Sequence, residues 1–341
     1  INLIKRIFRV LTLKRKYQII GLCLLLIVCG LLEMISIASA IPFISVVTNP
    51  DRLGNITLLN KILEIFKIYG DRNITIFITC SFILFITFST LLRIINVWVS
   101  SKFSAKIGND ISKQIVINTI SIPYQQIISI NSSNNITTLT TYLEQTIYVI
   151  NMLLVSLSSI ILISSIIISL YLVSGNLIFI LITSIGSFYL ILMRLLINRI
   201  KINSRNKAYL EVKKVKFIQE LFGSIRDIIL DSLQYLVIKK YSKIERPIRQ
   251  IYSEEWFINF FPKYLIESFA IITLIISAVV LNENERFAAI GVIPLIGAIA
   301  VGAQKILPLS QQLYSSWSLI SGNYSGVDQL LRILEYKNIP N

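Results

Sequence analysis

Histidine is absent from the 341-residue sequence, and cysteine is scarce. Without an imidazole, the chain lacks the commonest general base and metal ligand of proteins. The three cysteines, Cys23, Cys29 and Cys80, all fall inside apolar runs, and we interpret them as small buried residues rather than as a disulfide or a metal site. No G-x-x-x-x-G-K-[ST] phosphate loop occurs, so this sequence has no site of its own for ATP hydrolysis.

Formal charge is also missing over long stretches, above all between Glu144 and Arg194. That run is long enough for two bilayer crossings of about 20 residues each, and Ser174-Gly175-Asn176 near its middle is a turn signal. The chain is 54% hydrophobic and has a mean hydropathy of +0.71, which is too apolar for an ordinary soluble domain. We therefore expect an all-α membrane protein.

The apolar runs predict six membrane spans. They lie near residues 17–47, 74–98, 148–173, 176–196, 263–281 and 287–310. Of the 33 Lys and Arg residues, 28 belong to segments on one predicted side of the membrane or at its ends. Because positive residues concentrate in cytoplasmic loops, both termini are predicted to be cytoplasmic. The net charge of +15 is interpreted as this inner-leaflet bias, not as affinity for nucleic acid.

Two segments between predicted spans continue as long helical patterns on the cytoplasmic side. Residues 194–222 contain neither Pro nor Gly, and a helix of that length is over about 40 Å long and extends well beyond the bilayer. A short irregular piece joins each pair of helices, around residues 122–135 and 223–234. Channels rarely send two helical hairpins so far into the cytosol, so this layout favours a transporter that contacts a soluble motor.

Four short motifs accompany the layout. They are Ile41-Pro42-Phe43-Ile44, Leu92-Arg93-Ile94, Pro262-Lys263 followed by Glu267, and Lys305-Ile306-Leu307-Pro308. Together they resemble the transmembrane domain of an ABC exporter of the type IV fold, most closely the flippases that move polyprenyl-pyrophosphate-linked oligosaccharides. The resemblance covers nearly the entire chain. Arginine is usual in that family where Lys263 and Lys305 stand here, and lysine keeps the charge but loses the bidentate fork for phosphate.

The resemblance implies an ATPase, a second copy of the chain and a lipid substrate. The chain begins with Ile1 and is expected to be a fragment, with a nucleotide-binding domain (and its ATP and Mg²⁺) following Asn341 or supplied as a separate subunit. A homodimer in the inner membrane would translocate an anionic lipid-linked glycan; export of peptides or drugs is the alternative. The two irregular pieces would be coupling helices docked on the nucleotide-binding domains, or else plain turns. The coupling candidates are Pro123, Tyr124, Gln125, Gln126, Leu230, Asp231 and Ser232.

Three cations are predicted at one depth, near the inner edge of the membrane. Arg93, Lys263 and Lys305 each lie roughly 27–29 Å from the outer end of their span, at about 1.5 Å per residue. Charges at membrane depth usually face a cavity, so these cations are candidates for binding a pyrophosphate. The alternatives are snorkelling to headgroups and local pairing, since Glu267 follows Lys263 by four residues. Glu33 is expected to pair with one of the cations or to act in gating.

The outer loop between the first two spans carries an amphipathic pattern of about three turns. Such a helix is suited to lying at the membrane interface, and in the flippases that this chain resembles a short external helix in the same loop meets the lipid tail. A lid packed on the spans is the alternative. The apolar candidates are Leu59, Ile62, Leu63 and Phe66.

A membrane-embedded glycosyl- or acyltransferase is the rival from another class. It would need a polar catalytic constellation, yet the chain has no histidine and no D-x-D pair in the mapped loops. A pure scaffold or receptor would leave the shared depth of the three cations unexplained. The sequence therefore favours a transporter whose chemistry lies in binding and movement.

Overall fold

A computed structural model describes residues 2–48, 70–121, 132–174, 177–282 and 292–335. Every regular element within these residues is helical, and the described part contains no β-strand. The all-α prediction is confirmed to this extent. The external-helix candidates and the coupling candidates Pro123 to Gln126 lie outside the described residues.

The helices differ greatly in length. In chain order they are α1 (Asn2–Val10), α2 (Leu13–Ala38), α3 (Ala40–Thr48), α5 (Asp71–Ile120), α7 (Ser132–Thr137), the π-helix η2 (Thr138–Tyr142), α8 (Leu143–Ser174), α9 (Leu177–Gly223), α10 (Ile225–Leu230), α11 (Gln234–Asn282), α12 (Val292–Gly322) and α13 (Tyr324–Glu335). At 50, 47 and 49 residues, α5, α9 and α11 are about 70–75 Å long, more than twice the thickness of a bilayer core.

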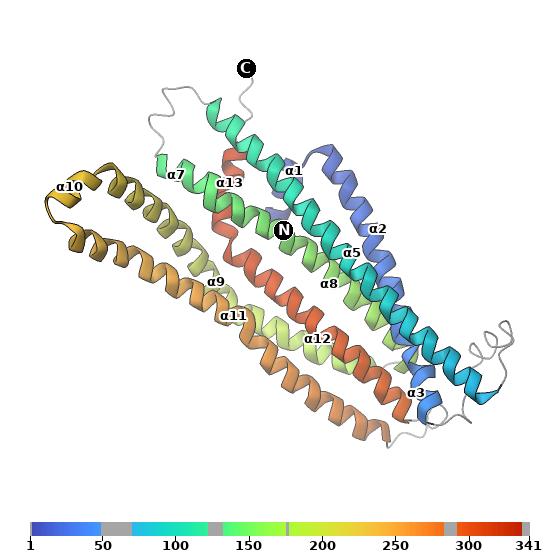
Figure 1. The fold of residues 1–341 in the computed structure, drawn as a ribbon. Helices are drawn as coiled ribbons and strands as arrows, with labels where there is room; N and C mark the ends of the chain where they lie inside the picture. Colours follow the sequence, from blue (N-terminus) through green and yellow to red (C-terminus); the bar gives the residue numbers. More distant parts are fainter. Residues whose placement is uncertain (1, 49–69, 122–131, 175–176, 283–291, 336–341) are drawn as a thin grey trace.

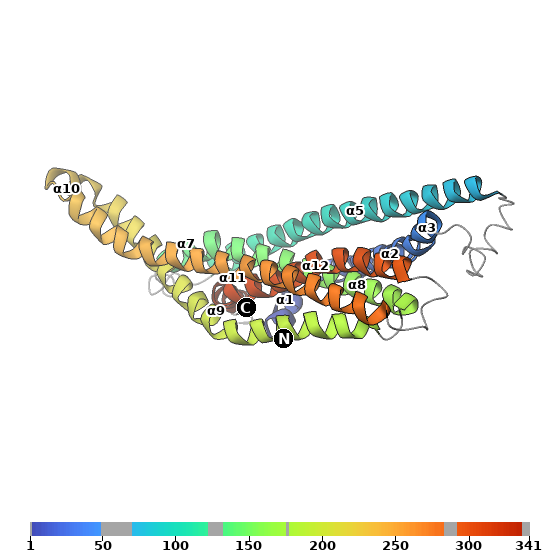
Figure 2. The ribbon, with the colours of Figure 1, turned by 90° about the horizontal axis from the view of Figure 1, so that it is seen from below.

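The long helices form an elongated bundle that divides toward one end (Figure 1). Helix α8 contacts α2, α5 and α12, whereas α9 packs mainly along α11. The antiparallel pair α9 and α11 leaves the bundle as a hairpin with α10 at its tip, and this tip lies far from the other helices (Figures 1 and 2). The long uninterrupted helix predicted over residues 194–222 is therefore present.

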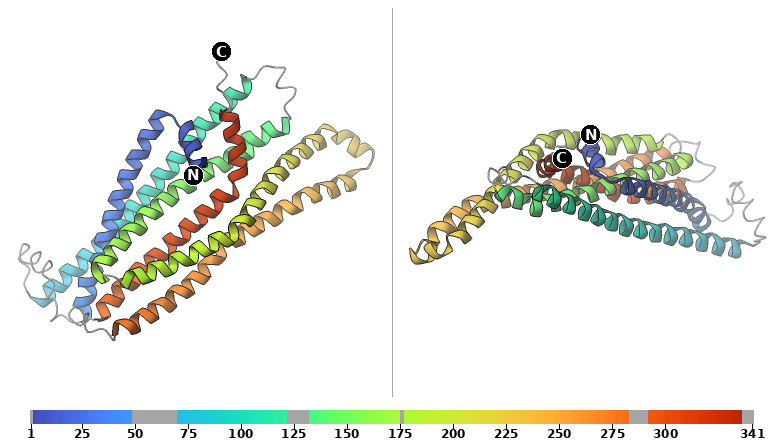
Figure 3. Two further views of the ribbon diagram at one scale, coloured as in Figure 1. Left: turned by 180° about the vertical axis from the view of Figure 1, so that it is seen from behind. Right: turned by 90° about the horizontal axis from the view of Figure 1, so that it is seen from above.

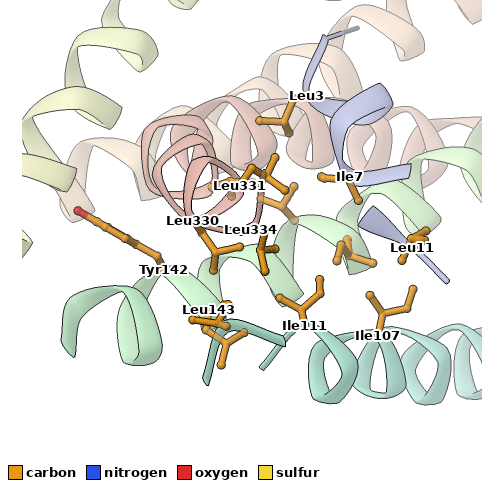
Figure 4. Close-up of a cluster of buried hydrophobic side chains, with 14 of the residues drawn as sticks. Leu3, Ile7, Leu11, Ile107, Ile111, Tyr142, Leu143, Leu330, Leu331 and Leu334 are labelled. Atoms are coloured by element: carbon orange, nitrogen blue, oxygen red, sulfur yellow. The ribbon is translucent and has the colours of Figure 1, made fainter. Parts of the chain in front are cut away.

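The largest apolar core lies where the two ends of the chain meet. Residues from α1, α5, η2, α8 and α13 interdigitate there (Figure 4). The short α1 lies beside α13, so that the N-terminal and C-terminal helices pack together (Figure 3). Fully buried Tyr142 closes one side of this core and donates a hydrogen bond of 2.9 Å from its hydroxyl to the Ala208 carbonyl of α9. This buried hydrogen bond therefore joins α9 to the core.

Three helical segments of the described part are long and apolar enough to cross a membrane. They are Leu13–Val47, Arg72–Ile120 and Ser132–Leu172. The first two contain the predicted spans 17–47 and 74–98, and the third covers residues 148–172 of the predicted span 148–173. The predicted spans 176–196 and 287–310 include residues outside the described part. The predicted span 263–281 lies within α11 (Gln234–Asn282) but is not among these three segments, so all three spans stay predictions.

The first predicted span differs from the expected single helix, because α2 ends at Ala38 and α3 begins at Ala40. Pro42 has no backbone N–H, so it cannot bond to the Ala38 carbonyl four residues earlier. The Ser39 hydroxyl instead donates a 2.8 Å hydrogen bond to the Ser36 carbonyl at the end of α2. The break thus lies one turn before the proline, which is tolerated in the first turn of α3.

Candidate functional site

A charged cluster lies between three of the long helices. Lys305 on α12 has its Nζ 2.9 Å from Oε1 of Glu33 on α2, and it donates a 3.2 Å hydrogen bond to Ser36 Oγ. The second carboxylate oxygen of Glu33 accepts a hydrogen bond from the hydroxyl of Ser89 on α5. The Glu33 side chain is only 8% exposed. Because removing one partner would leave a buried charge unpaired, this cluster holds α2, α5 and α12 together.

Helix α8 fixes the two helices that carry this ion pair. A Cβ at Gly302 of α12 would lie 2.5 Å from the Leu170 side chain of α8, so a larger residue there would force this fully buried side chain to shift. On the other side, Ser169 of α8 donates a 3.0 Å hydrogen bond to the Met34 carbonyl of α2. The position of the ion pair therefore follows from close packing and not from the charges alone.

The other two predicted cations have different surroundings. Lys263 Nζ lies 3.8 Å from Glu267 Oε1 on the same helix, and both side chains are about half exposed. This is the local pair that the four-residue spacing allowed, and such an exposed pair contributes little to stability. Arg93 on α5 is half-buried and forms no ion pair with any residue that the structure describes. The three cations are therefore not equivalent, and of the three only Arg93 has no carboxylate partner among the described residues.

Asn96 is a further polar residue near Arg93 that the sequence did not indicate. It lies three residues along α5 and is 4% exposed. Its Oδ1 has no hydrogen-bond partner among the described residues. Residues three apart lie on one face of a helix, so Arg93 and Asn96 present a cation and a buried amide side by side. An asparagine within an apolar run is a weaker sequence signal than a charge, which is why only Arg93 was predicted.

A second buried ion pair lies further along the bundle, outside the predicted spans. Lys207 of α9 is 3% exposed, and its Nζ contacts both carboxylate oxygens of Glu255 on α11 at 2.7 and 3.0 Å. The same Nζ donates a 3.0 Å hydrogen bond to Asn323 Oδ1, at the junction of α12 and α13. Burial raises the pKa of the Glu255 carboxyl, and Lys207 opposes this shift. The α9–α11 hairpin is thereby joined to the end of α12.

The tip of this hairpin exposes apolar side chains. All of α10 is free of buried residues, and Ser232 in the turn that follows has a left-handed backbone with φ of 54°. The exposed apolar side chains of the tip are Phe222, Ile225, Ile229, Leu230, Leu233, Leu236 and Ile238. The predicted coupling residues Leu230, Asp231 and Ser232 therefore lie at an exposed tip.

The described residues contain no group of three or more Cys, Asp or Glu side chains that could hold a metal ion. The structure thus offers two kinds of candidate site, a set of charged residues on the long helices and an exposed hairpin tip. Comparison with known proteins adds no family assignment, because no protein-family model and no curated protein matches this sequence.

Proposed function

We propose that this chain is the transmembrane half of an ATP-driven ABC exporter, with six spans, cytoplasmic termini and a second copy as its partner in the inner membrane. The observation that carries the proposal is the hairpin of α9, α10 and α11. Its apolar tip stands away from the rest of the bundle (Figure 1). An exposed apolar patch of this kind is typical of a surface that binds a partner, and we infer that the partner is a nucleotide-binding domain.

Specific contacts would transmit movement of the tip to the rest of the molecule. The buried contacts of Lys207 with Glu255 and Asn323 join the hairpin to the end of α12. Helix α12 also carries Lys305, which forms an ion pair with Glu33 of α2. Close-packed helices with buried ion pairs move as units and not by continuous bending. Closure of the ATPase domains would therefore shift α12 relative to its neighbours.

The proposed substrate is an anionic, amphipathic lipid, best represented by a lipid-linked glycan with a pyrophosphate. Arg93 supplies the available charge, with the Asn96 amide beside it. Lys305 is already neutralised by Glu33, so a phosphate would have to replace that carboxylate before binding Lys305. Substrate binding and the contact between α2 and α12 would then compete for the same ammonium group.

The tip can be tested with two isoleucines of matched exposure. Ile229 in α10 is 58% exposed, and Ile202 in the middle of α9 is 56% exposed. In the full-length protein reconstituted in liposomes, Ile229→Glu should reduce ATP-dependent translocation of a fluorescent polyprenyl-pyrophosphate oligosaccharide about tenfold or more, because a charge is placed in an apolar interface. The control Ile202→Glu should change the rate less than about twofold by the same argument. Equal rates for both variants and the unmodified protein would contradict docking at the tip.

A further inference from the structure

A groove of about 930 Å³ runs between α9 and the junction of α12 with α13. It lies on the side of the hairpin where α13 contacts α9. Its wall on α9 includes Ile197, Lys201, Arg205 and Tyr209, which recur every four residues along one helix face. The opposite wall comes from residues 321–332. The groove is separate from the Glu33–Lys305 cluster and from the hairpin tip.

The groove carries an excess of positive charge. Lys201 and Arg205 are exposed and form no ion pair with any residue in the described part of the chain. Arg332 contributes a third cation and lies 3.0 Å from the carboxylate of Asp328. The same carboxylate also forms an ion pair with Arg6. Asp328, the only carboxylate among the described residues that line the groove, is thus already bound to two arginines. The two cations of α9 therefore remain available to an anion.

The α9 wall of the groove reaches the depth of the inner lipid headgroups in the proposed orientation. Helix α9 begins at Leu177, so Ile197 is about 30 Å along it, near the inner edge of the hydrocarbon. Lys201 and Arg205 follow about 6 and 12 Å further on, where phosphates and headgroups lie. The groove thus has an apolar end at the hydrocarbon boundary and a cationic part in the headgroup layer.

We propose that this groove binds the phosphate headgroup of an anionic phospholipid from the inner leaflet. Lys201 and Arg205 would supply charge-assisted hydrogen bonds to the phosphate oxygens, while Ile197 would contact the start of an acyl chain. A free phosphate compound shares the anionic chemistry but gains nothing from the apolar end. The proposal depends on the membrane orientation given above and not on ATP-driven transport, so it can fail or hold independently of transport.

Binding to the purified full-length protein in neutral detergent tests this proposal. Short-chain phosphatidylglycerol is titrated against the unmodified protein and against Lys201→Gln/Arg205→Gln, with bound lipid measured by native mass spectrometry. The control is Lys243→Gln/Arg246→Gln, which removes one lysine and one arginine that are also exposed and also lack an ion pair with a described residue. We expect the groove variant to bind about tenfold more weakly, and the control to bind within about twofold of the unmodified protein.

Three outcomes would overturn the proposal. Equal binding of short-chain phosphatidylcholine would show that the anionic headgroup is not recognised. Complete displacement of the lipid by glycerol phosphate at equal concentration would indicate a site for a soluble phosphate. Equal losses in the groove variant and in the control would indicate attraction to net charge alone. A circular-dichroism melting curve that is unchanged in the groove variant makes weaker binding attributable to the groove and not to unfolding.

Discussion

At the scale of single residues, two Lys–Glu pairs with the same chemistry have opposite physical settings. The Glu33–Lys305 pair is shielded and has hydroxyl partners on two helices. The Lys263–Glu267 pair joins successive turns of one helix and is about half exposed. Breaking a buried pair leaves an uncompensated charge in a low-dielectric site, whereas water and ions screen an exposed pair. Burial, and not the type of charge, decides which pair determines how the helices are joined.

We therefore expect substitution of these two lysines to have unequal effects on the free energy of unfolding. Lys305→Gln should lower the free energy of unfolding by about 3–5 kcal/mol, the usual effect of breaking a buried pair. Lys263→Gln should change it by less than about 1 kcal/mol, as expected for an exposed pair. Denaturation of both variants in the same detergent measures the difference. The double variant Glu33→Gln/Lys305→Gln should regain part of the loss, and a double variant less stable than Lys305→Gln would contradict the assignment.

At the scale of elements, the clearest unit is the contact between the first and last described helices. Arg6 of α1 forms ion pairs with Asp328 and Glu335 of α13, above an apolar layer in which Leu3 and Ile7 face α13 (Figure 4). Apolar burial supplies most of the attraction, because each buried aliphatic side chain contributes about 1.5–3 kcal/mol. The charges then fix the relative orientation of the two helices.

This contact should weaken in acid. The hydrogen bond from Arg6 holds the pKa of the Glu335 carboxyl below its ordinary value of 4.5. A lowered pKa in the folded state gives stability that is present above the ordinary value and is lost as the pH falls through the lowered value. Spin labels at Lys5→Cys and Tyr324→Cys should therefore show a narrow distance distribution at pH 7 that broadens below about pH 4.5.

Glu335→Gln is the matched variant for this pH experiment. It removes the titrating carboxylate, so the distance distribution should already be broader at pH 7 and should change less on acidification. If the unmodified contact kept the same distribution down to pH 3, the ion pairs of Arg6 would have no measurable part in holding α1 against α13.

The elements also show what could be predicted from the sequence. The pairing of Lys263 with Glu267 follows from helix periodicity, and the continuous helix over residues 194–222 follows from the absence of Pro and Gly. The contact of Lys207 with Glu255 joins residues 48 positions apart, and no local pattern indicates such a pair. For Glu33, the sequence offered several cationic partners, and the packing of α2 and α12 on α8 selected Lys305.

At the scale of the whole molecule, the elongated shape would separate three tasks of the proposed transporter. Three segments are long and apolar enough to cross a membrane, the cluster around Glu33 and Lys305 joins α2, α5 and α12, and the hairpin ending in α10 presents an apolar tip at a distance (Figure 3). The proposed mechanism depends on these parts lying on particular sides of a membrane. If the tip faced the outside or lay along the lipid surface, an intracellular ATPase could not bind it.

Cysteine labelling of the full-length protein decides this orientation. In a variant whose natural cysteines Cys23, Cys29 and Cys80 are replaced by serine, Tyr235→Cys lies beside the tip at a position that is 74% exposed. It should react with a membrane-impermeant maleimide in inside-out vesicles but not in intact cells, because the positive-inside bias places this segment in the cytoplasm. Asn60→Cys, in the predicted outer loop, should give the opposite pattern and is the matched control. If both cysteines reacted from the same side, an odd number of crossings would no longer separate them, and the hairpin could not be the link between this membrane domain and a cytoplasmic ATPase.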